Sequence, residues 1–155
     1  MIGISACLGG ICCRYDGQAK EIPALKKLVE NGQAMLVCPE VLGGLPIPRD
    51  PAEIIGGDGF DVWNDQAKVI TNTGEDMTDM FKQGAVTAYQ KLVEYNITTI
   101  ILKENSPSCG SNGIYDGTFS GNRRKGPGVA TAYFISKGLN VVSQSDWQTL
   151  IGCEK

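Results

Sequence analysis

Blocks of apolar and polar residues alternate along the 155-residue chain and predict strands and helices in turn. Short apolar runs bounded by turn residues are typical of buried strands, whereas apolar residues at three- and four-residue steps are typical of helices. The expected strands are Ile2–Ala6, Ala34–Val37, Thr98–Leu102 and Val141–Val142. The expected helices run from Pro23 to Gly32, over Met77–Tyr95 and from Pro127 to Gly138, with a last short helix after Ser145.

The alternation of strands and helices predicts an α/β fold with a mostly parallel central sheet, covered by helices on both faces to give three layers. The stretch from Ala52 to Asn72 differs, because it alternates more and carries turn signals at Gly56–Gly59. We expect a small antiparallel excursion there. The length suits one domain, so we expect residues 1–155 to form a single unit.

The composition is that of a packed globular protein, with 42% hydrophobic and 20% charged residues. The formal net charge of -3 gives no general attraction to phosphates, so we expect no nucleic-acid partner. The sequence contains no long apolar run and no secretory leader pattern. We therefore expect a cytoplasmic protein that does not enter a membrane.

The chain contains six cysteines and no histidine. The lack of histidine excludes Ser-His-Asp and Cys-His catalysis and every histidine-ligated metal site. Proton transfer near neutral pH must then use a carboxylate, thiol, hydroxyl, amine or water. A disulfide framework is not expected in the reducing cytoplasm, so a metal site would rest mainly on cysteine thiolates.

Three cysteines are placed where the fold would bring them together. Cys7 and Cys38 directly follow the first two predicted strands, and Cys109 lies in the loop after the strand Thr98–Leu102. Parallel strands end at one edge of a sheet, where ligands bind. Each of these cysteines is followed within a few residues by glycine or proline, which suits loops that hold a cluster. Three thiolates allow a [4Fe–4S] cluster with one open iron, or zinc if Cys12 or Cys13 supplies a fourth ligand.

Several short motifs occur in an order that resembles the TudS-type thiouracil desulfurases. They are Ser5–Gly9, Arg14–Gly17, Cys38–Glu40, and Ser106–Gly110. The resemblance spans nearly the whole chain. It implies a Rossmann-like fold and a [4Fe–4S] cluster on three cysteines. It also implies an enzyme that removes sulfur from a thiolated base, such as 2- or 4-thiouracil, without redox chemistry, releasing uracil and hydrogen sulfide.

The resemblance also assigns roles to residues. Cys7, Cys38 and Cys109 would ligate the cluster, and the substrate sulfur would bind the open iron to give a [4Fe–5S] intermediate. Glu40 would act as the catalytic acid and base, and Ser106 would be the second catalytic residue. The residues that we expect to contact substrate are Arg14, Tyr15, Asp16, Arg49 and Ser108. Of these, Ser108 is also the alternative to Ser106, and Arg49 is expected to pair with a carboxylate or a substrate oxygen.

Other functions remain open on the sequence alone. The main alternative is a non-catalytic zinc- or iron–sulfur-binding protein in intracellular sulfur handling. A thiol redox protein using Cys12 and Cys13 is a weaker interpretation, because adjacent cysteines form a poor dithiol pair. The run Arg123–Lys125 is expected to be a solvated loop, with contact to a nucleotide phosphate or tRNA as the alternative. Relatives that act on tRNA carry an additional domain, so we expect a free base as substrate and hydrosulfide as the sulfur product. The oligomeric state stays open.

Overall fold

The structure is a computed structural model that describes residues 1–9, 22–46, 49–104, 106–110 and 112–143. The helix expected after Ser145 lies outside the described residues. So do Cys12, Cys13 and Cys153.

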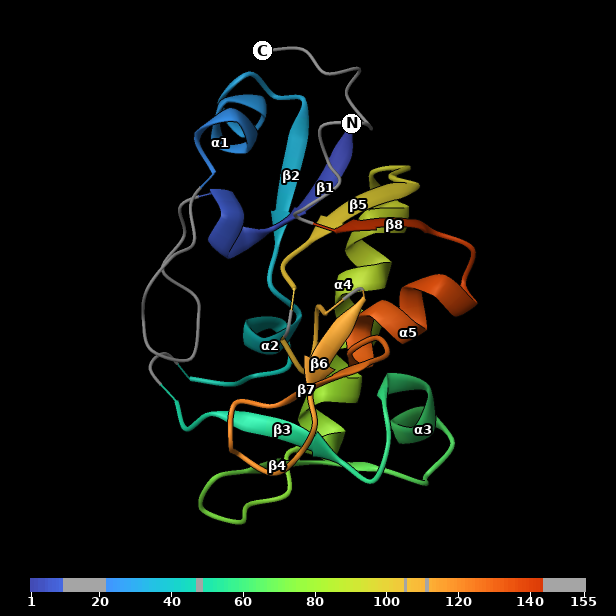
Figure 1. The fold of residues 1–155 in the computed structure, drawn as a ribbon. Helices are drawn as coiled ribbons and strands as arrows, with labels where there is room; N and C mark the ends of the chain where they lie inside the picture. Colours follow the sequence, from blue (N-terminus) through green and yellow to red (C-terminus); the bar gives the residue numbers. More distant parts are fainter. Residues whose placement is uncertain (10–21, 47–48, 105, 111, 144–155) are drawn as a thin grey trace.

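The central sheet is parallel and contains the strands that the apolar runs predict (Figure 1). Its members are β1 (Ile2–Ser5), β2 (Ala34–Val37), β5 (Thr99–Leu102) and β8 (Asn140–Ser143). They lie in the order β2-β1-β5-β8, and each neighbouring pair is parallel. The expected α/β class and parallel sheet are confirmed.

Helices cover both faces of this sheet, as expected. The helices are α1 (Pro23–Glu30), α4 (Thr78–Glu94) and α5 (Val129–Ser136). Successive strand residues point to opposite faces. Ile100 accordingly packs with residues of α4 and α5, and its neighbour Ile101 packs with Leu25 of α1.

The expected antiparallel excursion is confirmed as a hairpin that lies apart from the central sheet (Figure 1). It pairs β3 (Ala52–Ile55) with β4 (Lys68–Thr71). The connection contains α3 (Gly59–Trp63), which the turn signals did not predict. Asp58 caps this helix by accepting a hydrogen bond from the backbone N–H of Asp61, whose side chain accepts from the Asp58 N–H. The polar residues that signal a turn here therefore also begin a short helix.

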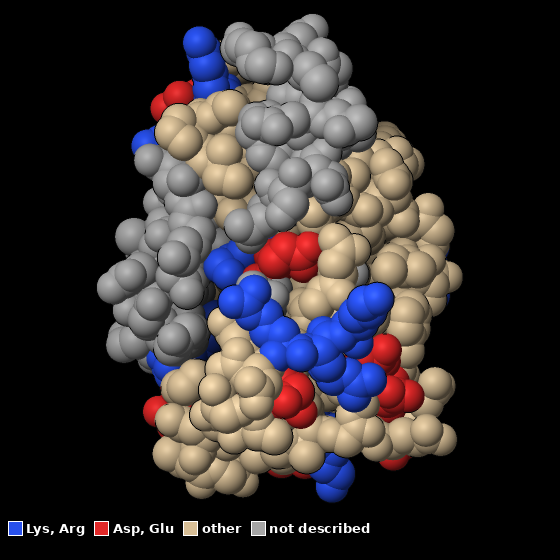
Figure 2. Space-filling model, in the orientation of Figure 1, with Lys and Arg blue, Asp and Glu red and all other residues tan. Residues whose placement is uncertain are grey.

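A second hairpin lies in the region after Thr98–Leu102, where the sequence predicts loops that include Arg123–Lys125, so that prediction was wrong in part. The hairpin pairs β6 (Gly113–Tyr115) with β7 (Arg123–Lys125). All three residues of β7 are exposed, so the basic run is solvated as expected but lies in a strand. Figure 2 shows lysine and arginine side chains gathered over the middle of the face of the protein that is turned toward the viewer.

Two short helices follow β1 and β2 without an intervening loop. A 3₁₀ helix, η1 (Ala6–Gly9), follows β1, and α2 (Pro39–Leu42) follows β2. Both are too short for periodicity to reveal. Pro39 occupies the first turn of α2, where its missing N–H costs nothing. Among the described residues, no helix is long and apolar enough to cross a membrane.

Candidate functional site

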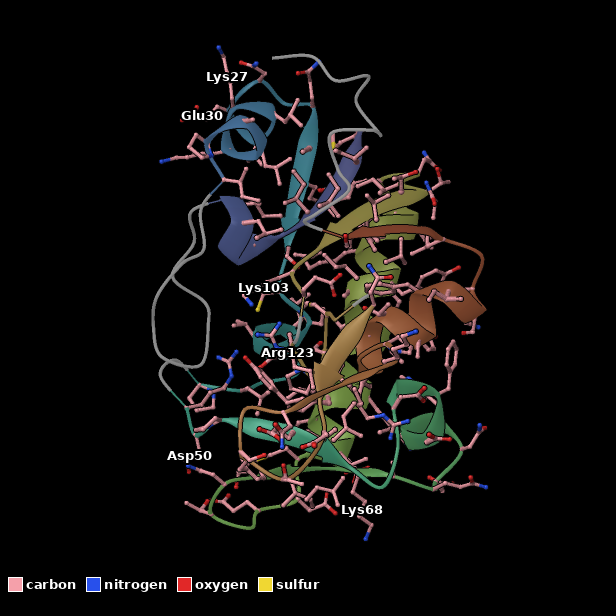
Figure 3. All side chains as sticks on the ribbon, viewed as in Figure 1. Lys27, Glu30, Asp50, Lys68, Lys103 and Arg123 are labelled. Carbon is pink, nitrogen blue, oxygen red and sulfur yellow. The ribbon has the colours of Figure 1, made fainter. Side chains whose placement is uncertain are left out.

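The carboxyl edge of the central sheet carries residues from three strands. Cys38 follows β2 and Lys103 follows β5, while Cys7 lies in η1 directly after β1. The side chain of Cys7 is outside the described part of the structure, as are residues 14–16. The position of the Cys7 backbone nevertheless agrees with the expected convergence at this edge. Figure 3 shows Lys103 between the central sheet and α2, with Arg123 nearby in the same view.

A cavity of about 760 Å³ opens between this edge and the β3–β4 hairpin. One wall comes from the sheet edge, α2 and the loop after β5. The opposite wall comes from the two hairpins. The lining residues used below are Cys38, Glu40, Arg49, Ser106, Cys109, Glu53, Tyr115, Phe81 and Phe119. The cavity therefore brings together most of the described residues that the sequence singled out.

Helix α2, which carries Glu40 and begins at Cys38, is held against α4 by close backbone contact. A Cβ at Gly84 of α4 would overlap the carbonyl oxygen of Pro39, and a Cβ at Gly43 would overlap the carbonyl oxygen of Met80. Backbone atoms cannot move aside as a flexible side chain can. Two glycines thus allow α2 to sit where Cys38 and Glu40 face the cavity.

We expect Gly84→Ala to destabilise the protein by about 1–3 kcal/mol, because the new methyl group must separate α2 from α4. Helix propensity alone predicts the opposite sign, a gain of roughly 0.5–1 kcal/mol. Urea unfolding would measure the change, with Gln90→Ala at an exposed position of the same helix as the control. Stabilisation of Gly84→Ala would contradict the proposed contact.

The loop that carries Cys109 is ordered by Ser106 and by α5. The Ser106 Oγ accepts hydrogen bonds from the backbone N–H groups of Ser108 at 3.1 Å and Cys109 at 3.2 Å. The carbonyl oxygens of Pro107 and Ser108 accept from the first N–H groups of α5, including Val129 at 2.7 Å. These bonds satisfy donors that a helix start otherwise leaves unpaired. The loop is therefore fixed from both sides.

Glu40 is the central member of a chain of three hydrogen-bonded side chains that line the cavity. Its Oε1 accepts from Arg49 Nε at 3.2 Å and from Nη2 at 2.9 Å. Its Oε2 accepts from the Ser106 hydroxyl at 3.0 Å. The Arg49 side chain is 7% exposed and that of Glu40 is 16% exposed, so the pair is largely shielded from water. Arg49 thus pairs with a carboxylate, which is one of its two expected roles.

Ser106 and Ser108 have different surroundings. Ser106 contacts Glu40 and lines the cavity. Ser108 is fully buried, and its Oγ has no hydrogen-bond partner among the described residues. The Ser108 hydroxyl is nevertheless close enough to the Cys109 sulfur to favour its thiolate form. The geometry therefore favours Ser106 over Ser108 as the group that works with Glu40.

Cys109 is a buried thiol beside two acidic neighbours. Burial raises its pKa well above the ordinary range, and the nearby Cys38 and Glu40 raise the pKa further. The neighbouring hydroxyl groups of Ser5 and Ser108 lower the pKa of Cys109 and so act in the other direction. A bound cation would reverse this balance, because metal ligation deprotonates a thiol.

The donor set at the cavity fits a cluster held by sulfur ligands. Cys38 and Cys109 both line the cavity, and the Cys7 backbone lies at the same sheet edge. Among the side chains that the structure describes, no three His, Cys, Asp or Glu residues form a metal-binding group.

Two cavity residues escaped the sequence reasoning. Glu53 is a buried carboxylate on β3, and its Oε1 accepts from the backbone N–H groups of Gly117 and Phe119. Phe119 itself lines the cavity. A charged residue within the apolar strand Ala52–Ile55 was the available signal. No sequence signal marked Phe119.

Comparison with known proteins identifies the family. Residues 2–146 match the family described as 2-thiouracil desulfurase. The chain belongs to this family. It is 47% identical over 151 residues to the uncharacterized protein YbbK of Bacillus subtilis (strain 168), covering 97% of this chain and all of that protein.

A solved structure is similar over the same extent. It is that of the [4Fe-4S]-dependent thiouracil desulfidase TudS, at 41% identity and a TM-score of 0.85. The match covers 97% of this chain and 94% of the TudS chain. The resemblance predicted from the motifs is confirmed, and so is the α/β fold. The family is one of desulfurases, which favours an enzyme over a non-catalytic sulfur-handling protein.

Proposed function

We propose that this protein is a [4Fe–4S]-dependent desulfurase that converts a thiolated pyrimidine, such as 2-thiouracil, to uracil and hydrogen sulfide. The observation that carries this proposal is the chain from Arg49 through Glu40 to Ser106, beside Cys38 and Cys109 in one cavity. Family membership and the similarity to TudS support the same activity.

Cys7, Cys38 and Cys109 would hold the cluster. Held by three cysteines, the cluster would supply a Lewis-acidic site for the substrate sulfur, and the adjacent carbon would thereby be more electrophilic. Reduced thiols are required for such ligation, and the cytoplasm maintains them. Gly110 allows the Cys109 loop to fold tightly, because a Cβ there would overlap the carbonyl oxygen of Gly113.

Glu40 and Ser106 would handle the protons of the attacking water. The Ser106 hydroxyl already donates to Glu40 Oε2, so its proton can move to the carboxylate as Ser106 takes one from water. The two backbone N–H groups on Ser106 Oγ stabilise the negative charge that develops on that oxygen. Arg49 fixes Oε1 and leaves Oε2 directed at Ser106.

The reaction balances without an oxidant or a reductant. The water oxygen forms the new bond to carbon, and the carbon–sulfur bond breaks. One water proton reaches Glu40 through Ser106, and the other leaves with sulfur as hydrosulfide. Glu40 then returns its proton to solvent or to the departing sulfur, which restores the starting state.

The test is anaerobic purification or reconstitution of the wild-type protein, followed by analysis and assay. We expect about four irons and a similar amount of acid-labile sulfide per chain. We also expect uracil and sulfide in equal amounts from 2-thiouracil, without added reductant. A protein that binds zinc in place of iron, or that carries the cluster but leaves both 2-thiouracil and 4-thiouracil intact, would contradict the proposal.

A further inference from the structure

The cavity wall opposite the cysteines carries an unusual aromatic residue, Phe119. Phe119 lines the cavity and is 37% exposed, although it is large and apolar. Its backbone φ of +55° lies in the left-handed region, which bulky residues rarely adopt. Backbone strain of this kind persists where surrounding contacts enforce it, and it is concentrated at functional sites. Another contact must therefore hold the backbone of Phe119 in this conformation.

Glu53 supplies that contact. Glu53 is 8% exposed, and its Oε1 accepts from the N–H of Phe119 at 3.1 Å and of Gly117 at 2.9 Å. Gly117 also has a left-handed backbone, and a Cβ there would lie 2.7 Å from the carbonyl oxygen of Ile54. The loop between β6 and β7 is thus fastened onto β3 through one buried oxygen.

The other aromatic residues of the cavity are less available to a ligand. Phe81 is 2% exposed and packs in the core under the hairpin, and Tyr115 is half-buried on β6. Among the described lining residues, Phe119 is therefore the aromatic side chain with the most exposed surface. A planar heterocycle that enters the cavity would find its apolar stacking surface there.

We propose that Phe119 determines substrate binding by stacking on the ring of the thiolated pyrimidine, and that Glu53 is the positioning residue that holds Phe119 in place. This inference rests on the proposed function for the identity of the substrate. Stacking between a base and an aromatic side chain is strong enough to change affinity about tenfold or more. Stacking acts on the intact substrate ring, so its effect on affinity does not depend on any step of the reaction.

The first experiment compares Phe119→Leu with Phe119→Tyr in the reconstituted enzyme. Both replacements keep a Cβ and hence the same backbone strain, but only Tyr keeps an aromatic face. We expect Phe119→Leu to raise KM for 2-thiouracil about tenfold with kcat within about twofold of wild type, and Phe119→Tyr to keep KM near the wild-type value. An unchanged KM in Phe119→Leu would overturn the proposal.

The second experiment tests whether Glu53 acts through Phe119. We expect Glu53→Ala to raise KM as Phe119→Leu does, and the double variant to be no worse than either single variant. Glu53→Gln keeps an oxygen acceptor and should retain most of the affinity. A merely structural role would lower the iron content of Glu53→Ala and add to the effect of Phe119→Leu on KM, which would refute the positioning role.

Direct binding separates this inference from the proposed function. Calorimetric titration of 2-thiouracil into the cluster-loaded wild type and Phe119→Leu needs no turnover. An inactive wild type that still binds 2-thiouracil about tenfold more tightly than Phe119→Leu would defeat the proposed function and leave the stacking role intact. Equal affinity in the two proteins would defeat the stacking role, whatever the activity.

Discussion

Replacing Glu40 by Gln is expected to lower the turnover of 2-thiouracil by about 10²–10⁴-fold while the iron content stays at the wild-type level. The amide has nearly the same shape and can still accept a hydrogen bond from Arg49. It cannot take the Ser106 proton, which in the proposed mechanism passes to the carboxylate along a hydrogen bond of 3.0 Å. Without a histidine in the chain, no neighbouring imidazole can replace this base.

The measurement is kcat in anaerobic steady-state kinetics, with iron and sulfide determined on the same sample. Glu94→Gln, at an exposed position near the end of α4, is the matched control and should behave as wild type. Ser106→Ala should lower kcat to a similar extent, and the double variant should add little, because the two residues act as one unit. Full activity in Glu40→Gln with an intact cluster would remove Glu40 from the mechanism.

Much of the scaffold could be predicted from sequence because parallel strands leave a strong local signal. Apolar runs such as the one that forms β5 predicted the strands of the central sheet to within one or two residues. Glycine and proline marked where the neighbouring helices begin and end. The edge of that sheet then followed from topology, which is why the sequence could place Cys38 at that edge.

Short elements were missed because they depend on contacts between distant segments. Helix α2 has only four residues, and its place depends on Gly84, which lies more than forty residues further along the chain. The β6–β7 hairpin has a polar, glycine-rich sequence that is equally typical of a loop. Its position depends on Glu53 of another hairpin. Periodicity cannot reveal such pairings.

The candidate site was predicted unevenly for the same reason. Motif order suggested Glu40 and Ser106, and the structure places them in direct contact. The salt bridge from Arg49 to Glu40 was one of two alternatives for that arginine. The sequence could not identify Phe119 as a site residue. Its place in the cavity depends on a left-handed backbone conformation, and nothing in the neighbouring sequence indicates that conformation.

The removal of single cysteines should produce the largest effect on the protein, which is complete loss of the cluster. We expect Cys7→Ala, Cys38→Ala and Cys109→Ala each to lose the iron and the activity after anaerobic reconstitution. Two remaining thiolates are too few for a cluster that normally takes three or four. Cys12→Ala and Cys13→Ala are the controls and should keep about four irons per chain.

Folding can be separated from ligation at Cys109, where the two are easiest to confuse. Its side chain is buried in the main core with Ala130 and Phe134. Exchange for alanine removes one sulfur atom and should cost only about 1 kcal/mol of stability. Circular dichroism and thermal unfolding of the cluster-free proteins should therefore show Cys109→Ala folded like wild type while its iron is lost. Loss of iron in Cys12→Ala or Cys13→Ala would instead indicate a fourth ligand, and a fully ligated cluster would leave no iron open to bind the substrate sulfur.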